Sequence, residues 1–177
     1  MKTFILGGIR SGKSRLAENL AQQSRKNLIY VATATASDHE MKARIEKHQA
    51  YRNKEWVVVE EAHHIGKILN EFSSDKNCLL VDCLTLWMTN LLMTEDENFL
   101  QQQRQTLLKA VSEFKGKLFM VGNETSMGII PNGELTRRFC DEAGILHQEV
   151  AALSDKVVLT VAGLPLILKG KHLHGMA

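Results

Sequence analysis

The sequence predicts an α/β fold in three layers, with a mostly parallel β-sheet covered by helices on both faces. Short apolar runs alternate along the chain with longer helix-like segments. Runs that are apolar throughout are typical of strands buried on both faces of a parallel sheet, and the helices supply the crossovers that such a sheet needs. A glycine-rich loop after the first apolar run fits the same layout.

The strands follow from these runs in chain order. They are expected at 3–6, 28–33, 56–60, 78–82, 117–122 and 156–163. A last run, 164–169, follows Gly163 and is expected to return as an antiparallel edge strand. Between the runs, helices are expected at 14–24, 38–52, 62–72, 84–93, 98–115 and 134–153. The segment 94–99 is expected to be an exposed loop, and the tail from 169 to 177 to fray.

Composition limits the classes of function. The 177 residues suit one domain, 1–177, because no repeat or low-complexity linker divides them. The 22 basic and 20 acidic residues nearly cancel, which argues against a nucleic-acid partner. No apolar stretch approaches the roughly 20 residues that span a bilayer, so membrane insertion is not expected. Three cysteines without a CxxC spacing favour reduced thiols and a cytoplasmic protein.

The loop GGIRSGKS, residues 7–14, has the GxxxxGK[ST] spacing of a phosphate-binding loop between a strand and a helix. Its backbone N–H groups and the helix N-terminus would hold a polyphosphate, while Lys13 reaches the β- and γ-phosphates. The Ser14 hydroxyl would hold Mg²⁺. The alternative is a turn that binds nothing. The predicted nucleotide-binding residues here are Gly7, Gly8, Ile9, Arg10, Ser11, Gly12, Lys13 and Ser14.

A second Mg²⁺ ligand is expected at the end of another apolar strand. Asp82 ends the run CLLVD and is the candidate. The alternative is that Asp82 caps the helix expected to follow, and the two roles can coexist.

Further motifs resemble the adenosylcobinamide kinase/adenosylcobinamide-phosphate guanylyltransferase family of cobalamin biosynthesis. They are GGIRSGKSRLAE (7–18), YVATA (30–34), DHEMKARIEKHQAYR (38–52), WVVVEE (56–61), VDCLTLWMTNLL (81–92), NETSMGIIP (123–131) and VAGLPLILK (161–169). They stand in the family's order over nearly the whole chain.

The resemblance implies a RecA-like P-loop NTPase fold and two reactions. A nucleoside triphosphate, ATP or GTP, phosphorylates adenosylcobinamide, and GTP then donates GMP to adenosylcobinamide phosphate. Mg²⁺ is the implied cofactor, and a homotrimer the implied assembly. The alternatives are a P-loop small-molecule kinase without a covalent intermediate and a nucleotide-dependent switch.

The same resemblance places a guanylylated histidine at His48, flanked by Arg44 and Arg52. Imidazole is largely neutral near pH 7 and is then a good nucleophile. Four-residue spacing would put both arginines on its helical face. The segment after the histidine, Gln49, Ala50, Tyr51 and Arg52, is included in the predicted nucleotide site.

Two alternatives compete with a catalytic His48. Met41, Ile45 and His48 follow a helical apolar spacing, so His48 could simply be packed in the core. Lys47 also forms phosphoramidates, although on a helix it points about 100° away from His48.

Residues at other strand ends complete the prediction. Thr33, Ala34 and Thr35 resemble the family's nucleotide-contacting segment, with turn capping as the alternative. Glu60 is the expected guanine reader, and its neighbour Glu61 is the rival.

The expected substrate side of the site is less specific. Asn123 and Glu124 follow a strand where substrate could arrive, with a polar loop as the alternative. Arg137 and Arg138 would meet phosphate or line a helix surface. His147 stands where the family pattern leads us to expect asparagine.

Overall fold

The computed structural model describes residues 1–34 and 56–171 of the chain. The elements in chain order are β1 (Lys2–Gly7), α1 (Lys13–Gln22), β2 (Asn27–Ala32), β3 (Trp56–Glu60), α3 (Ile65–Glu71), β4 (Asn77–Asp82), α4 (Leu84–Leu92), α5 (Glu97–Glu113), β5 (Lys117–Asn123), α6 (Glu134–Leu153), β6 (Lys156–Val161) and β7 (Leu164–Lys169).

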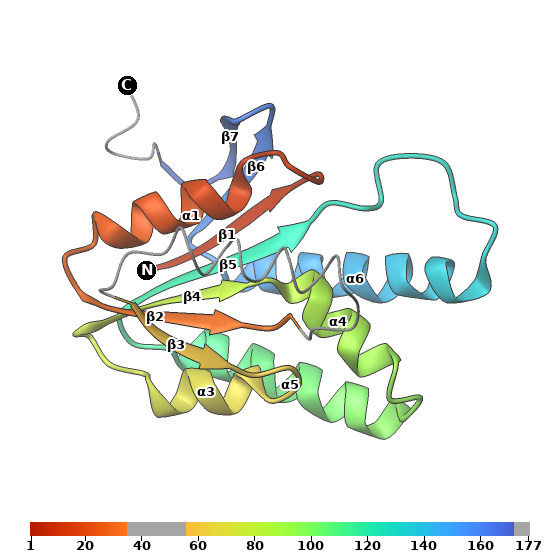
Figure 1. The fold of residues 1–177 in the computed structure, drawn as a ribbon, viewed down its shortest axis with the longest axis horizontal. Helices are drawn as coiled ribbons and strands as arrows, with labels where there is room; N and C mark the ends of the chain where they lie inside the picture. Colours follow the sequence, from red (N-terminus) through yellow and green to blue (C-terminus); the bar gives the residue numbers. More distant parts are fainter. Residues whose placement is uncertain (35–55, 172–177) are drawn as a thin grey trace.

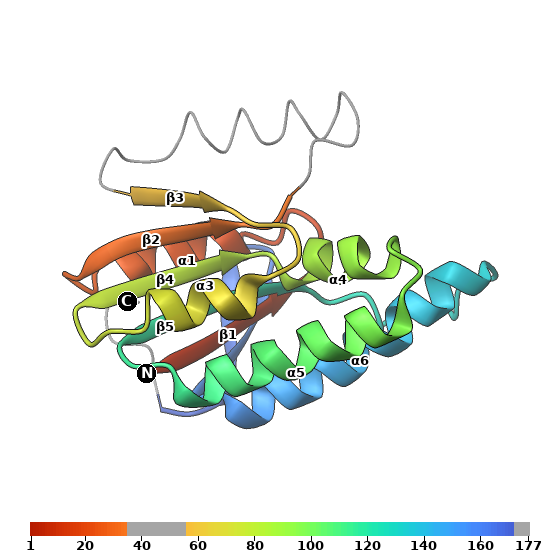
Figure 2. The same ribbon diagram turned by 90° about the horizontal axis from the view of Figure 1, so that it is seen from below.

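The described strands form one seven-stranded sheet in the order β3-β2-β4-β5-β1-β6-β7. Neighbouring strands from β3 to β6 pair in parallel, and β7 pairs antiparallel to β6. The expected mostly parallel sheet with an antiparallel C-terminal edge is confirmed. The apolar runs of β1, β2, β4, β5 and β6 are largely buried because helices cover both faces of the sheet (Figures 1 and 2). The two edge strands differ from the expectation, since β3 and β7 carry exposed apolar side chains.

The two faces have separate cores. Residues of α1 pack with Ile5, Tyr30 and Leu80 on one face, whereas α3, α4, α5 and α6 pack with Phe4, Ile29 and other residues on the opposite face. Consecutive residues of one strand enter different cores because strand side chains alternate between faces.

Three boundaries differ from the expectation. Residues 97–99 are the first turn of α5 and not a loop, because the Asp96 carboxylate accepts a hydrogen bond from Phe99 N at 3.0 Å and caps the helix. Helix α3 begins at Ile65, three residues after the expected start at residue 62. Strand β6 ends at Val161, because Ala162 and Gly163 adopt positive φ and turn the chain into β7.

The expected helix 38–52 lies within 35–55, outside the residues that the structure describes. No helix in the described ranges is long and apolar enough to cross a membrane.

Candidate active site

The phosphate loop lies between the end of β1 at Gly7 and the start of α1 at Lys13. Arg10 has φ 57° and Gly12 has φ 93°. These left-handed backbone conformations bend the loop sharply. The amide of Ser11 donates to the Gly8 carbonyl at 3.2 Å and closes the turn. The strand–loop–helix context predicted from the sequence is therefore present.

Lys13 and Ser14 lie on the first turn of α1, behind this loop. Lys13 is buried, and its Nζ donates to the Gly8 carbonyl at 3.0 Å. Burial lowers the pKa of Lys13, and the negative charge of Asp82 opposes that shift. A buried ammonium held against the loop is well suited to phosphate oxygens. The Ser14 side chain is half-buried, whereas Ile9 and Arg10 form an exposed tip.

Neighbouring strands hold the loop in place. Gly7 pairs in register with Asn123 of β5 and with Thr160 of β6. A Cβ on Gly7 would lie 2.6 Å from the Thr160 carbonyl oxygen, so this position requires glycine. The turn after β6 also contacts the loop, since Gly163 N donates to the Ser11 carbonyl at 2.9 Å.

Asp82 ends β4, next to β2, at the same carboxyl edge of the sheet. The buried Tyr30 hydroxyl donates to its Oδ2 at 2.8 Å. Within the described part of the chain, Oδ1 makes no hydrogen bond. One carboxylate oxygen and the Ser14 hydroxyl are hard oxygen donors of the kind that Mg²⁺ prefers, so the residues present fit that ion.

The capping role considered for Asp82 is wrong. Cys83 is the N-cap of α4, and its Sγ accepts a hydrogen bond from Leu86 N at 3.5 Å. Burial, together with the charge of Asp82, raises the pKa of the Cys83 thiol to about 11. The group therefore stays a neutral thiol near pH 7.

Thr33 is fully buried beside Cys83. Its hydroxyl donates to the Cys83 carbonyl at 2.7 Å and accepts from the Cys83 amide at 2.8 Å. Asn90 of α4 donates to the Thr33 carbonyl at 2.8 Å and to the Ala62 carbonyl at 3.1 Å. This geometry favours the turn-stabilising role for the Thr33 side chain. Ala34 follows at the same edge and is half-buried.

Two adjacent glutamates at the end of β3, Glu60 and Glu61, have different surroundings. Glu60 is exposed and pairs in register with Ala32, which places it at the carboxyl edge. Glu61 accepts hydrogen bonds from the amides of His63 and His64 at 2.8 and 2.9 Å. Burial raises the pKa of Glu61, but these hydrogen bonds outweigh it and hold the pKa below its usual value. Glu61 is thus engaged in the turn that leads into α3, which leaves Glu60 as the candidate guanine reader.

Glu124 folds back on its own loop. Its carboxylate accepts hydrogen bonds from Ser126 N at 3.0 Å, from the Ser126 hydroxyl and from Met127 N at 3.2 Å. Partial burial raises the pKa of Glu124, and these donors more than reverse the shift. Burial lowers the pKa of nearby His147, which packs against Phe4 with ring centroids 5.4 Å apart.

The two arginines of α6 also have structural partners. Arg137 donates to the Pro131 carbonyl at 3.1 Å and to that of Asn132, and Arg138 pairs with Glu97 of α5. Both side chains are exposed on the helix surface, which favours the surface role over phosphate contact.

Several predicted residues fall in the range 35–55 that the structure leaves undescribed. They are Thr35, Arg44, Lys47, His48, Gln49, Ala50, Tyr51 and Arg52. Conversely, the sequence interpretation missed Tyr30 and Asn90, which fix the edge around Asp82 and Thr33. A phenol within an apolar run is usually part of the core, so the sequence pattern alone assigns no partner to Tyr30.

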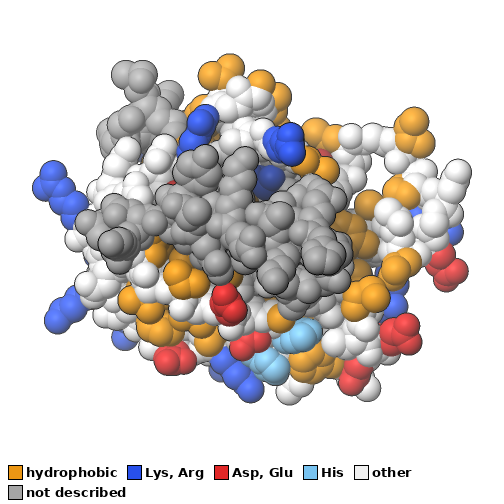
Figure 3. Space-filling model, viewed as in Figure 1, with side chains coloured by type: hydrophobic (Ala, Val, Ile, Leu, Met, Phe, Trp, Pro, Cys, Tyr) orange, Lys and Arg blue, Asp and Glu red, His pale blue; other side chains and the backbone are white. Residues whose placement is uncertain are grey.

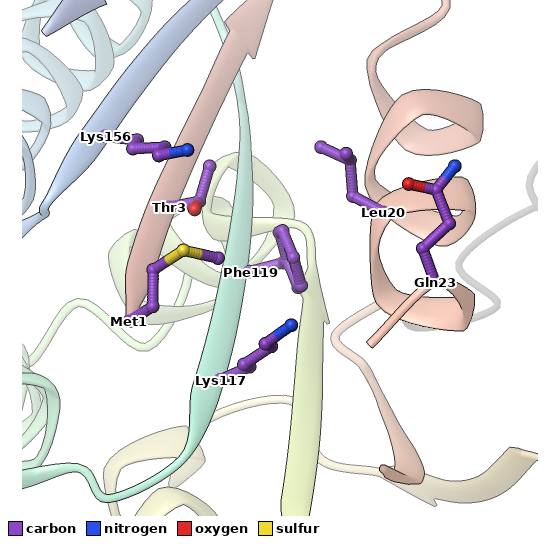
Figure 4. Close-up of a pocket in the computed structure, with 7 residues that line it drawn as sticks. All are labelled: Met1, Thr3, Leu20, Gln23, Lys117, Phe119 and Lys156. Carbon is purple, nitrogen blue, oxygen red and sulfur yellow. The ribbon is translucent and has the colours of Figure 1, made fainter. Parts of the chain in front are cut away.

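The pocket in Figure 4 lies away from these residues, with a cavity volume of ≈ 260 Å³. Its lining includes Thr3, Lys117 and Lys156 at the amino ends of three strands, Leu20 of α1, and Gln23 directly after α1. Parallel α/β sheets bind ligands at their carboxyl ends, so we place the site at the phosphate loop.

The fold resembles that of solved structures. The RadB recombinase superposes with a TM-score of 0.53 at 13% identity, covering 89% of this chain and 73% of that one. An ATPase of a bacterial type III secretion system gives a TM-score of 0.55 at 14% identity, and the match covers 89% of this chain and 51% of that one. These neighbours confirm the RecA-like P-loop NTPase fold and nothing further.

Sequence relatives are closer. The chain is 49% identical over 173 residues to the bifunctional adenosylcobalamin biosynthesis protein CobP of Pseudomonas aeruginosa, covering 98% of this chain and all of the relative. It is 34% identical over 182 residues to the bifunctional adenosylcobalamin biosynthesis protein CobU of Escherichia coli K12, and the match covers 96% of this chain and all of the relative. Residues 3–168 match the family described as cobinamide kinase / cobinamide phosphate guanyltransferase. The chain belongs to this family.

Proposed function

We propose that this protein phosphorylates adenosylcobinamide with a nucleoside triphosphate and then transfers GMP from GTP to adenosylcobinamide phosphate, giving adenosyl-GDP-cobinamide and pyrophosphate. The observation that supports this most directly is the phosphate loop. Its buried Lys13 and the nearby strand-end Asp82 are present in a chain of this family.

In the kinase step the loop amides and Lys13 bind and orient the triphosphate. The N-terminus of α1 adds positive potential behind the phosphates. Ser14 and Asp82 would hold Mg²⁺, which supplies charge neutralisation on the phosphate oxygens when bound. Tyr30 occupies one oxygen of Asp82, and among the described residues the other accepts no hydrogen bond.

In the transferase step we assign the nucleophile to His48. An imidazole nitrogen forms a bond to the α-phosphorus of GTP, the bond to the bridging oxygen breaks, and pyrophosphate leaves. The imidazolium so formed releases its remaining N–H proton. A phosphate oxygen of the acceptor then attacks the same phosphorus, the P–N bond breaks, and the histidine takes up a proton again. Glu60 would accept hydrogen bonds from N1 and N2 of guanine.

The test uses GTP labelled at the α-phosphate, incubated with the protein and Mg²⁺ without acceptor and then denatured. An acid-labile, alkali-stable adduct is expected in the wild type and in Lys47→Ala, and none in His48→Ala. Loss only in Lys47→Ala would move the nucleophile to that lysine. No adduct in the wild type would leave a P-loop kinase or a switch.

We also propose that the protein acts as a cytoplasmic homo-oligomer, a trimer by its resemblance to the family. The edge hairpin supports this, because Val161, Leu164, Leu166 and Leu168 are 55–73% exposed on it. Sedimentation of the wild type and of Leu166→Glu tests the assembly, and a monomeric wild type would refute it.

A further inference from the structure

The segment between β5 and α6, residues 124–133, forms an arm that extends past the end of the sheet together with the first turns of α6 (Figure 1). The arm starts at the phosphate loop. Asn123 pairs in register with Gly7, and Glu124 N donates to the Gly7 carbonyl at 3.0 Å. At its far end, Arg137 donates to the Pro131 carbonyl at 3.1 Å. Both ends of the arm are therefore fixed by hydrogen bonds.

The arm exposes large apolar side chains. Met127 is 75% exposed, Ile129 97% and Ile130 77%, and Ile9 at the tip of the phosphate loop is 80% exposed. Figure 3 shows hydrophobic side chains on the side of the molecule where Figure 1 draws the arm. Several large apolar side chains exposed on one short segment indicate a binding surface, because leaving contiguous apolar surface in contact with water is unfavourable.

The charges of the arm restrict what it binds. Between Glu124 and Glu134 the sequence is TSMGIIPNG, which contains no lysine, arginine or histidine. Arg137, from the first turn of α6, reaches the arm, but its guanidinium is held by the Pro131 and Asn132 carbonyls. The stretch 125–133 offers no cation of its own to a phosphate group or a nucleic acid. Its ligand should be apolar in part, and neutral or cationic.

We propose that the arm binds the macrocycle of the acceptor substrate, through Met127, Ile129 and Ile130. This inference rests on the proposed function. The acceptor oxygen must reach a phosphate held by the loop, so the bulk of the acceptor has to lie outward from it, over the adjoining surface. A cobalt(III) corrin has apolar ring faces, neutral amide arms and a positive charge at the metal, and these match the apolar stretch 125–133, which carries no charged side chain of its own.

The experiment compares Ile129→Ser and Met127→Ser with Met93→Ser, a matched control on a methionine that is 65% exposed after α4. Each arm variant should raise the KM for adenosylcobinamide about tenfold, because part of the apolar contact is lost. The KM for GTP and the labelling by GTP without acceptor should not change. Met93→Ser should match the wild type.

The outcomes separate this inference from the proposed function. If the wild type does not turn over adenosylcobinamide, both fail. If it does, and the arm variants keep the wild-type KM for adenosylcobinamide, only the arm assignment is overturned. Sedimentation is run on each variant. A higher KM that coincides with dissociation of an oligomer would assign the arm to a contact between copies and would also overturn the inference.

Discussion

Tyr30 is held rigidly beside the predicted metal ligand. It is 2% exposed, packs edge-on against Trp56 with centroids 5.8 Å apart, and donates to Asp82 Oδ2 at 2.8 Å. The phenol thereby fixes the orientation of the Asp82 carboxylate. We expect Tyr30 to be a positioning residue for Asp82.

Tyr30→Phe should raise the Mg²⁺ concentration needed for half-maximal activity several-fold, because Asp82 is free to rotate. The free energy of unfolding should fall by about 1–3 kcal/mol, the range for a lost hydrogen bond to a charged group. Activity titrated with Mg²⁺, and Mn²⁺ binding followed by electron paramagnetic resonance, measure the metal effect. Unchanged metal affinity in a destabilised variant would reduce Tyr30 to a packing role.

Glu60 and Glu61 provide a matched pair at one strand end. Glu60→Gln should raise the KM for GTP about tenfold or more, since a carboxylate that accepts two guanine N–H groups is lost, and leave stability unchanged. Glu61→Gln should instead lower the free energy of unfolding, because the carboxylate accepts the His63 and His64 amides. Steady-state kinetics and urea unfolding of both variants test these expectations. A raised KM for GTP in Glu61→Gln and a loss of stability in Glu60→Gln would exchange the two roles.

At the scale of elements, two helical glycines differ in how much space surrounds them: Gly66 is crowded and Gly144 is open. A Cβ on Gly66 of α3 would lie 2.9 Å from the backbone of Thr106 and Leu107 on α5. On Gly144 of α6 nothing lies within 4 Å of the added atom. Helices α3 and α5 therefore approach more closely than any side chain at position 66 would permit.

The same substitution should thus have opposite effects at the two sites. Gly66→Ala should cost about 1–3 kcal/mol of stability, because α3 must move away from α5. Gly144→Ala should stabilise by about 0.5–1 kcal/mol, the usual gain for alanine in a helix. Thermal or urea unfolding tests both. Equal effects would show that helix propensity, and not the close approach, determines the outcome at Gly66.

At the scale of the whole molecule, the phosphate loop joins the central strands. Its residues bond to β5 through Glu124 and to the β6–β7 turn through Gly163. A ligand bound there should oppose global unfolding and not just local fraying, because β1, which leads into the loop, and its neighbour β5 lie in the interior of the sheet.

GTP with Mg²⁺ at a hundred times its Kd should therefore raise the free energy of unfolding by about 2.7 kcal/mol. Removing Mg²⁺ with a chelator, or Asp82→Asn, should remove most of that gain. Unfolding curves recorded with and without nucleotide measure it. An equal gain in Asp82→Asn would exclude this carboxylate as a metal ligand.

Local signals in the sequence determined much of this protein. Continuous apolar runs specify strands buried on both faces, and the glycine spacing of residues 7–14 specifies a phosphate loop, because both depend on neighbours in the chain. Only the tertiary structure decided what depends on residues far apart in sequence. It joined the Thr33 hydroxyl to the Cys83 backbone across 50 positions and brought Tyr30 to Asp82 across 52 positions. Those roles arise from strand pairing, which no local pattern encodes.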